Sequence, residues 1–95
     1  MSDPLSLEMT LSREEFLRLL PVAVGLAVAT EDGGGFRGWD GARRWTIRLI
    51  PLADLRLGSV NLPRHRIDIQ LEGYSKGEVA AFMARFHRGF QRGGG

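Results

Sequence analysis

Apolar and polar residues alternate strictly over residues 66–72 of the segment RHRIDIQLEGY, residues 64–74, and this pattern is what most constrains the fold. Ile67, Ile69 and Leu71 fall on one side of an extended chain, and the residues between them fall on the other. This second, polar set is Arg66, Asp68, Gln70 and Glu72. One apolar and one polar side are typical of an antiparallel sheet with one face covered and one solvated. We therefore predict a strand near residues 65–73.

A second alternating segment precedes it. Residues 43–50 carry the same pattern, with Trp45 in the register of the aliphatic residues. Asp40-Gly41 just before this segment is a strong signal for a two-residue hairpin turn, with FRGW, residues 36–39, as the first arm. These features predict a strand over 43–50 and a first hairpin arm over 36–39 before it. Trp39 remains a large aromatic at a hairpin tip without an assigned role.

Two helix starts have the same signature. Ser12 with Glu15, and Ser75 with Glu78, have the spacing of a capping box. The first predicts a helix over 12–20 that ends at Pro21, and the second predicts a helix over 76–90 with an apolar stripe at helical spacing.

Residues 22–29 alternate by size, so a strand there would present its small residues on one face. These residues are Ala23, Gly25, Ala27 and Ala29. Such a strip lets another backbone approach closely, and it is the candidate interface of a homodimer or of a protein partner. In the alternative, the segment LADLRLGSVNL, residues 52–62, is a connection that folds over the strip within one chain.

The predicted fold class is α+β, a two-layer α/β sandwich in the order α-β-β-β-β-α. An antiparallel sheet of three to four strands carries the N- and C-terminal helices on one face. Residues 1–10 are expected to form a flexible leader, residues 11–91 a single domain, and residues 92–95 a flexible glycine tail.

The basic residues are almost all arginine and lie in the second part of the chain. Residues 1–32 hold two Arg and six acids, and residues 33–95 hold ten Arg, one Lys and five acids, for a net charge of +2. Arginine suits phosphate and carboxylate recognition, although a genome that favours arginine codons has the same composition. The candidate phosphate- or anion-binding residues are Arg43, Arg44, Arg85, Arg88 and Arg92. Nucleic acid is the second, less favoured partner.

Catalytic groups do not converge in this sequence. The chain has no Cys, which excludes thiolate catalysis and Cys-ligated metal sites. His65 and His87 have no third ligand at a recognisable spacing, and Ser59 is not in a nucleophile elbow. We expect no enzyme activity, no cofactor and no metal. No apolar run is long enough to span a bilayer, so we expect a cytoplasmic protein without membrane contact.

The chain ends in RGGG, and in this and in its size it resembles the ubiquitin-like sulfur carriers and modifiers. That resemblance implies a reactive C-terminal Gly-Gly, but here the tail follows a predicted helix, whereas in that family it follows a strand. The element order also resembles double-stranded RNA-binding domains in topology only. The sequence thus favours a small non-enzymatic interaction protein, with an arginine-based nucleic-acid or anion-binding module and a Gly-Gly carrier as alternatives.

Overall fold

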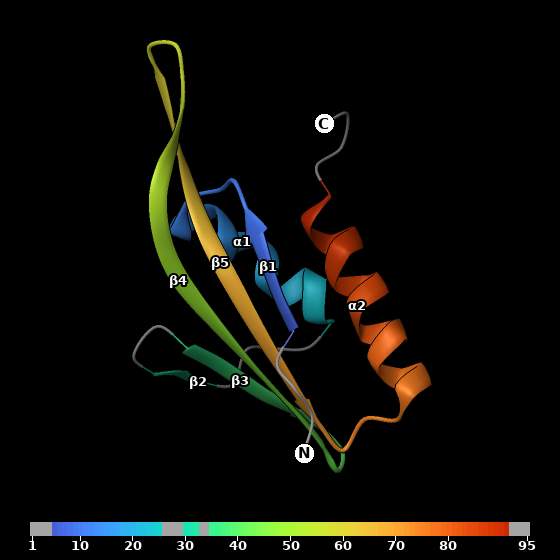
Figure 1. Cartoon of the computed structure of the whole chain (residues 1–95). Coiled ribbons are helices and arrows are strands. Elements are labelled where there is room, and N and C mark those ends of the chain that lie inside the picture. The colour runs from blue at the N-terminus through green and yellow to red at the C-terminus, as the bar shows by residue number, and fades with distance from the viewer. Residues whose placement is uncertain (1–4, 26–29, 33–34, 92–95) are drawn as a thin grey trace.

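The computed structural model describes residues 5–25, 30–32 and 35–91. It has the α+β architecture predicted from the sequence, with a sheet on one side and two helices on the other (Figure 1). The elements are β1 (Leu5–Met9), α1 (Arg13–Val24), β2 (Thr30–Asp32), β3 (Gly35–Asp40), β4 (Arg43–Leu57), β5 (Val60–Glu72) and α2 (Lys76–Phe90). No helix of the described residues has the length and apolar content needed to cross a membrane.

The five strands form one antiparallel sheet in the order β1-β5-β4-β3-β2. The predicted hairpin joins β3 to β4, with Asp40 opposite Arg43 and Gly41 in the left-handed conformation that the turn needs. The sheet has more strands than the three to four expected, because β1 and the short β2 add one strand at each edge.

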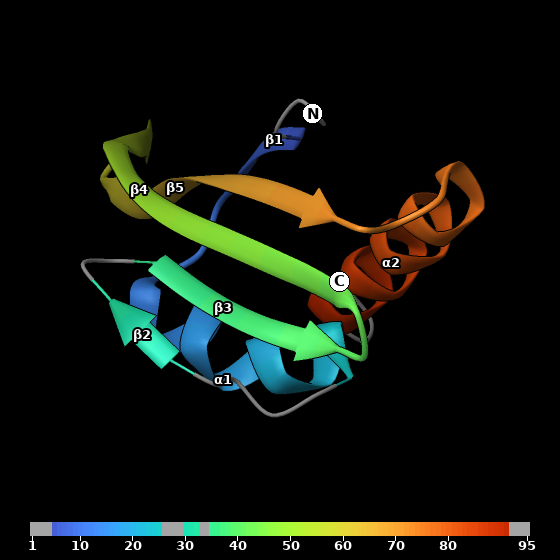
Figure 2. The same ribbon diagram turned by 90° about the horizontal axis from the view of Figure 1, so that it is seen from below.

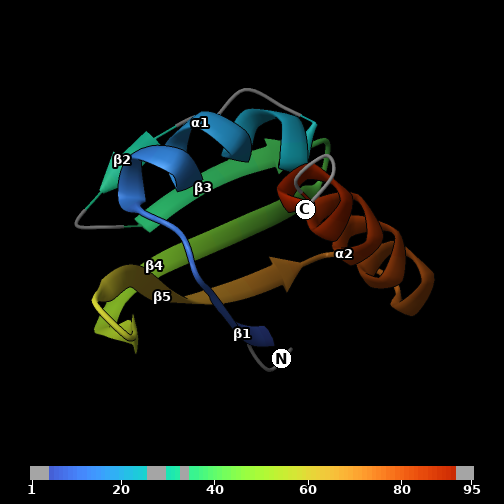
Figure 3. The same ribbon diagram turned by 90° about the horizontal axis from the view of Figure 1, so that it is seen from above.

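Both helices pack on the same face of the sheet. Trp45, Ile47, Ile67 and Ile69 are fully buried, as their alternating positions predicted. Phe16 and Leu20 of α1 and Phe86 of α2 close the core from the other side. Viewed from below and from above, α1 lies beside β2 and β3, and α2 lies beside α1 and the end of β5 (Figures 2 and 3).

The predicted cap of each helix forms. Ser12 accepts a hydrogen bond from the backbone N–H of Glu15 at 3.2 Å. At α2 both halves of the capping box are present, because Glu78 also accepts from the N–H of Ser75 at 2.8 Å. These bonds satisfy backbone donors that a helix start otherwise leaves open.

The strand expected over residues 22–29 is wrong for its first part, since α1 continues through Pro21 to Val24. Phe16, Leu20, Ala23 and Val24 are buried and follow the spacing of one helical face, so packing extends the helix past the proline. Gly25 then ends it with φ 70°. Ala27 and Ala29 lie outside the described residues.

The flexible leader expected over residues 1–10 contains strand β1 instead. Leu7 and Met9 pack against the core, and β1 pairs with β5 from Leu5 opposite Ile69 to Met9 opposite His65. The alternation of Leu5, Leu7 and Met9 with polar residues was the available signal. Pairing with the long edge of β5 gives this short strand the hydrogen-bond partners that it lacks alone.

Candidate interaction surfaces

The hairpin of β4 and β5 extends far beyond its neighbours. β3 pairs with β4 only as far as Arg48, and β1 pairs with β5 only from His65 onward. Residues 50–64 therefore form a two-stranded projection, which we call the arm, and the rest of the described chain is the body. In Figure 1 the arm extends past both helices. The connection expected over residues 52–62 does not fold over a strip of small residues, because it is part of these two strands.

One face of the arm is made of aliphatic side chains. The strand register puts Leu55 opposite Leu62 and Leu57 opposite Val60, so these four share a face. Along β5, this face is the one that points away from the helices, since Ile67 and Ile69 point toward them. Ile50 and Leu52 of β4 lie on it as well. The apolar face of the arm thus comprises Ile50, Leu52, Leu55, Leu57, Val60 and Leu62, and Arg64 lies on the same side opposite Leu52.

This apolar face is not part of the hydrophobic core. Leu57 is 56% exposed and Val60 is 52% exposed. Within the described residues, none of the six side chains belongs to the core cluster or packs against it. A row of aliphatic side chains on an open strand face is typical of a surface that another molecule covers.

A β-bulge keeps the apolar face continuous. A regular ladder continued from Trp45 opposite Leu71 would place Leu57 opposite Ser59. Leu57 instead pairs with Val60, so β4 has one extra residue. The extra residue lies between Leu52 and Leu55, where the register shifts. Arg64 donates from Nε to the carbonyl of Ala53 in this bulge at 3.0 Å. Without the shift, Leu55 and Leu57 would point to the opposite face from Leu52.

The same outer face of the sheet is polar over the body. This polar zone comprises Ser6 and Glu8 of β1, Arg37 and Trp39 of β3, Arg44, Thr46 and Arg48 of β4, and Arg66, Asp68, Gln70 and Glu72 of β5. Four arginines share it with three carboxylates. Trp39 lies opposite Arg44 and is 53% exposed, so its indole is available at the surface.

Ion pairs order one side of the polar zone. Arg44 pairs with Glu72, and Arg66 donates from Nε to Asp68 at 3.2 Å. Ser6 of β1 donates to the same carboxylate at 2.8 Å, which ties the edge strand to β5. The Ser6 hydrogen bond first, and then the contacts with Arg66, lower the pKa of Asp68 below its ordinary value.

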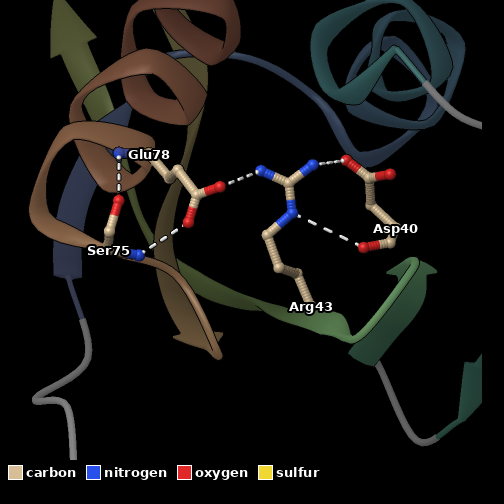
Figure 4. Close-up of polar contacts among 4 residues, drawn as sticks. All are labelled: Asp40, Arg43, Ser75 and Glu78. Atoms are coloured by element: carbon tan, nitrogen blue, oxygen red, sulfur yellow. Dashed lines mark hydrogen bonds and ion pairs between the residues drawn. The ribbon is translucent and has the colours of Figure 1, made fainter.

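Arg43 forms a second polar cluster at the far end of the sheet (Figure 4). Its guanidinium donates to Glu78 at 2.9 Å and pairs with Asp40, and it lies 5.2 Å from the centre of the Tyr74 ring. Glu78 is also the capping residue of α2, so this cluster, the latch, joins the β3–β4 turn to the start of the helix. The hydrogen bond from the Ser75 backbone lowers the pKa of Glu78, and Ser75 Oγ and Arg43 contribute further.

A cleft of about 320 Å³ lies beside the latch. It is lined by Val24, Asp40, Arg43, Tyr74, Glu78, Ala81, Phe82 and Arg85. The charges of two arginines and two carboxylates cancel in this cleft. Arg85 lies so near Gly25 that a Cβ at Gly25 would meet its Nη1 at 2.2 Å. It puts a positive charge at the C-terminus of α1, whose last turn has no basic residue. Both arginines therefore have a structural role.

The candidate anion-binding residues do not form one surface. Arg43 and Arg85 line the cleft, Arg44 points to the opposite face and pairs with Glu72, and Arg88 is exposed in the last turn of α2. Arg92 lies outside the described residues.

The candidate interface residues are not on an open strand face where they are described. Ala23 is buried in α1, where a Cβ added to Gly89 of α2 would meet its Cα at 2.4 Å. Small residues thus allow close approach here, but between the two helices of one chain. Gly25 ends α1.

The two histidines have structural surroundings. His65 Nδ1 lies 2.9 Å from the carbonyl oxygen of Leu11, and the ring of His87 packs edge-on near Phe86. In the described part of the chain, no three His, Asp or Glu side chains gather in a way that could hold a metal ion.

Comparison with known proteins finds no matching family model, no similar curated protein and no similar solved structure.

The sequence contained the signal for the arm, but not in its usual form. Leu55, Leu57, Val60 and Leu62 alternate with other residues on both sides of Gly58-Ser59, a two-residue turn. Pro51 and Pro63 bracket this segment, and they suggested a connection because proline is unusual inside a sheet. In the structure Pro63 lies opposite the bulge, where the regular ladder is already interrupted.

Proposed function

We propose that this chain is a small non-enzymatic interaction protein that associates with itself or with a protein partner through the apolar face of the arm. The observation that carries the proposal is the exposure of Leu57 and Val60 on an aliphatic face outside the core. Removing such side chains from water favours association roughly in proportion to the apolar area buried. A cytoplasmic location belongs to the same proposal.

Two neighbouring substitutions test this role. Val60 lies on the apolar face and Asn61 on the opposite face of the arm, and both are exposed. Val60→Asp places a charge in the contact, and Asn61→Asp adds the same charge outside it. We expect Val60→Asp to abolish self-association in sedimentation velocity from about 1 µM to about 1 mM, and Asn61→Asp to retain it. A dimer that survives Val60→Asp would show that the arm is not the interface.

A second candidate function is nucleic-acid binding by the polar zone. The favouring observation is that Trp39 is exposed beside Arg44, with Arg37 and Arg48 on the same face. An aromatic ring for base stacking among arginines for phosphate contact suits a single strand. These arginines differ from the set predicted from the sequence, apart from Arg44.

The test uses the emission of tryptophan. Trp39 is exposed and Trp45 is fully buried, so a stacked base should quench the exposed indole alone. Single-stranded RNA should quench emission at low salt, and Trp39→Phe should remove that change. Binding through phosphates should weaken steeply as salt rises. Unchanged emission and anisotropy at low salt would refute this candidate.

A further inference from the structure

We infer that the apolar face of the arm binds the same face of a second copy, with the two arms antiparallel and the two bodies at opposite ends of the dimer. This inference rests on the proposed function and specifies its partner and geometry. The charges of the polar zone decide the relative orientation of the two arms, and the area of the apolar face determines how tightly the copies bind.

The apolar face of the arm suits a copy of itself. Six of its residues are aliphatic, and Arg64 lies among them opposite Leu52. With the arms antiparallel, Arg64 meets Leu55 and Leu62 of the copy and not the copy's Arg64, so no like charges lie opposite each other. Arg64 and the neighbouring Arg66 are both ion-paired, since Arg64 lies 3.4 Å from Glu8 and Arg66 lies 3.2 Å from Asp68. A second copy can therefore stack on this face as one sheet stacks on another.

The polar zone decides between the two orientations of the arms. With the arms parallel, each body would lie over the other, and Arg48 would approach its own copy. The excess of arginine over carboxylate in the polar zone makes that arrangement repulsive. With the arms antiparallel, the tip of each arm reaches the base of the other. The two polar zones then lie far apart, and both remain open to solvent.

The size of the contact implies a reversible dimer. From Ile50 to Leu57 the arm is about 23 Å long at roughly 3.3 Å per residue, and it is two strands wide. This footprint is smaller than the roughly 800 Å² per partner of a standard interface, which is typical of a weak or transient association. A monomer 47 Å long that overlaps its copy by the arm gives a dimer about 70 Å long, whereas parallel arms give a dimer close to the monomer's length.

Cross-linking tests the geometry, and the absence of Cys from the chain makes single-cysteine variants straightforward. Leu57→Cys lies at the tip of the arm and Ile50→Cys at its base. A bismaleimide that spans about 10 Å, the distance between stacked sheets, is the reagent. For antiparallel arms, a mixture of the two variants forms a cross-linked heterodimer, and Leu57→Cys alone does not cross-link to itself. Small-angle scattering of the wild type then gives a maximum dimension of about 70 Å at concentrations where the dimer forms.

The outcomes separate this inference from the proposed function. Efficient cross-linking of Leu57→Cys to itself would overturn the antiparallel geometry, while the arm would remain the interface. If the protein sediments as a dimer but neither Leu57→Cys nor Ile50→Cys cross-links, both the antiparallel geometry and the arm as the interface would be overturned. Arg48→Cys in the polar zone is the matched control, because it cross-links to itself only if the two bodies face each other. A wild type that stays monomeric at about 1 mM would refute the inference.

Discussion

Strands β4 and β5 run through both the body and the arm, and the two parts of this strand pair differ in what lies against them. Trp45 and Ile69 in the body have no exposed surface, whereas Leu57 and Val60 in the arm are more than half exposed. Strand pairing is continuous through both halves apart from the bulge. Backbone pairing alone therefore does not determine burial. A second layer does, and within the described residues only the body has one.

The helices that form this second layer on the body also explain why the two-stranded arm is stable. An isolated two-stranded hairpin is marginally stable in water. Here the register is fixed at one end by core pairs such as Ile47 opposite Ile69, and at the other end by the turn at Gly58. The body thus supports an apolar surface that could not fold by itself, and it keeps that surface available for association.

The largest effect that tests this comparison comes from the same substitution in each half. Leu71→Ala in the body leaves a cavity under the helices and should lower the free energy of unfolding by about 2–5 kcal/mol. Leu57→Ala in the arm should change it by no more than about 0.5 kcal/mol for the monomer. Urea unfolding at a concentration below self-association measures both. Similar losses in the two variants would mean that the arm is part of the folded core.

A smaller effect comes from the contact between the helices, where two glycines of α2 form a matched pair. A Cβ at Gly89 would lie 2.4 Å from the Cα of Ala23, so Gly89→Ala should separate the helices and cost about 1–3 kcal/mol. A Cβ at Gly77 meets nothing within 4 Å, and Gly77→Ala should stabilise by about 0.5 kcal/mol. Thermal unfolding of both variants should show opposite shifts. A neutral Gly89→Ala would contradict the close approach of the helices.

Acid should weaken the body and leave the arm contact unchanged. The pKa values of Asp68 and Glu78 are lowered in the folded state. Both carboxylates therefore stabilise the fold at a pH above their unfolded-state pKa values. They lose this contribution as the pH falls through their folded-state pKa values. Stability should therefore decrease below about pH 4.5, and less steeply in Glu78→Gln. The dimerisation constant should be flat from about pH 5 to 8, because the apolar face has no titratable group. A steep change there would point to a charged interface.

A small effect should follow deletion of Ala53. It removes the extra residue of the bulge, so Leu52 opposite Arg64 and Leu55 opposite Leu62 become parts of one regular ladder. We expect unfolding to change by about 1 kcal/mol or less, mainly through the lost Arg64 hydrogen bond, and dimerisation to persist. Loss of the dimer with an intact fold would show that the bulge itself makes the contact.

Much of the body was predictable because its signals are local. The alternation around Ile67 and Ile69 and the cap at Ser75 predicted the central strands and the second helix. The end of α1 could not be predicted in this way, because Pro21 indicates that the helix ends there. Only the burial of Ala23 against Gly89 shows why the helix continues past the proline. Packing between distant segments cannot be derived from the order of residues near a proline.

The candidate surfaces were less predictable. The polar side of the central strands was expected, but the position of Trp39 on it depends on the pairing of β3 with β4. The apolar face of the arm depends on the bulge, because the pattern of β4 changes phase between Leu52 and Leu55. An alternation that changes phase is not recognised as one strand until the partner strand is known.

The bulge also has an evolutionary consequence. The core fixes the register at the base of the arm and the turn fixes it at the tip, so the arm cannot change length freely. One residue added to each strand would turn every side chain beyond that point to the other face, whereas two residues added to each strand would restore it. A single residue added to one strand needs another bulge. We therefore expect descendants of this gene that keep the contact to lengthen or shorten the arm in steps of two residues per strand.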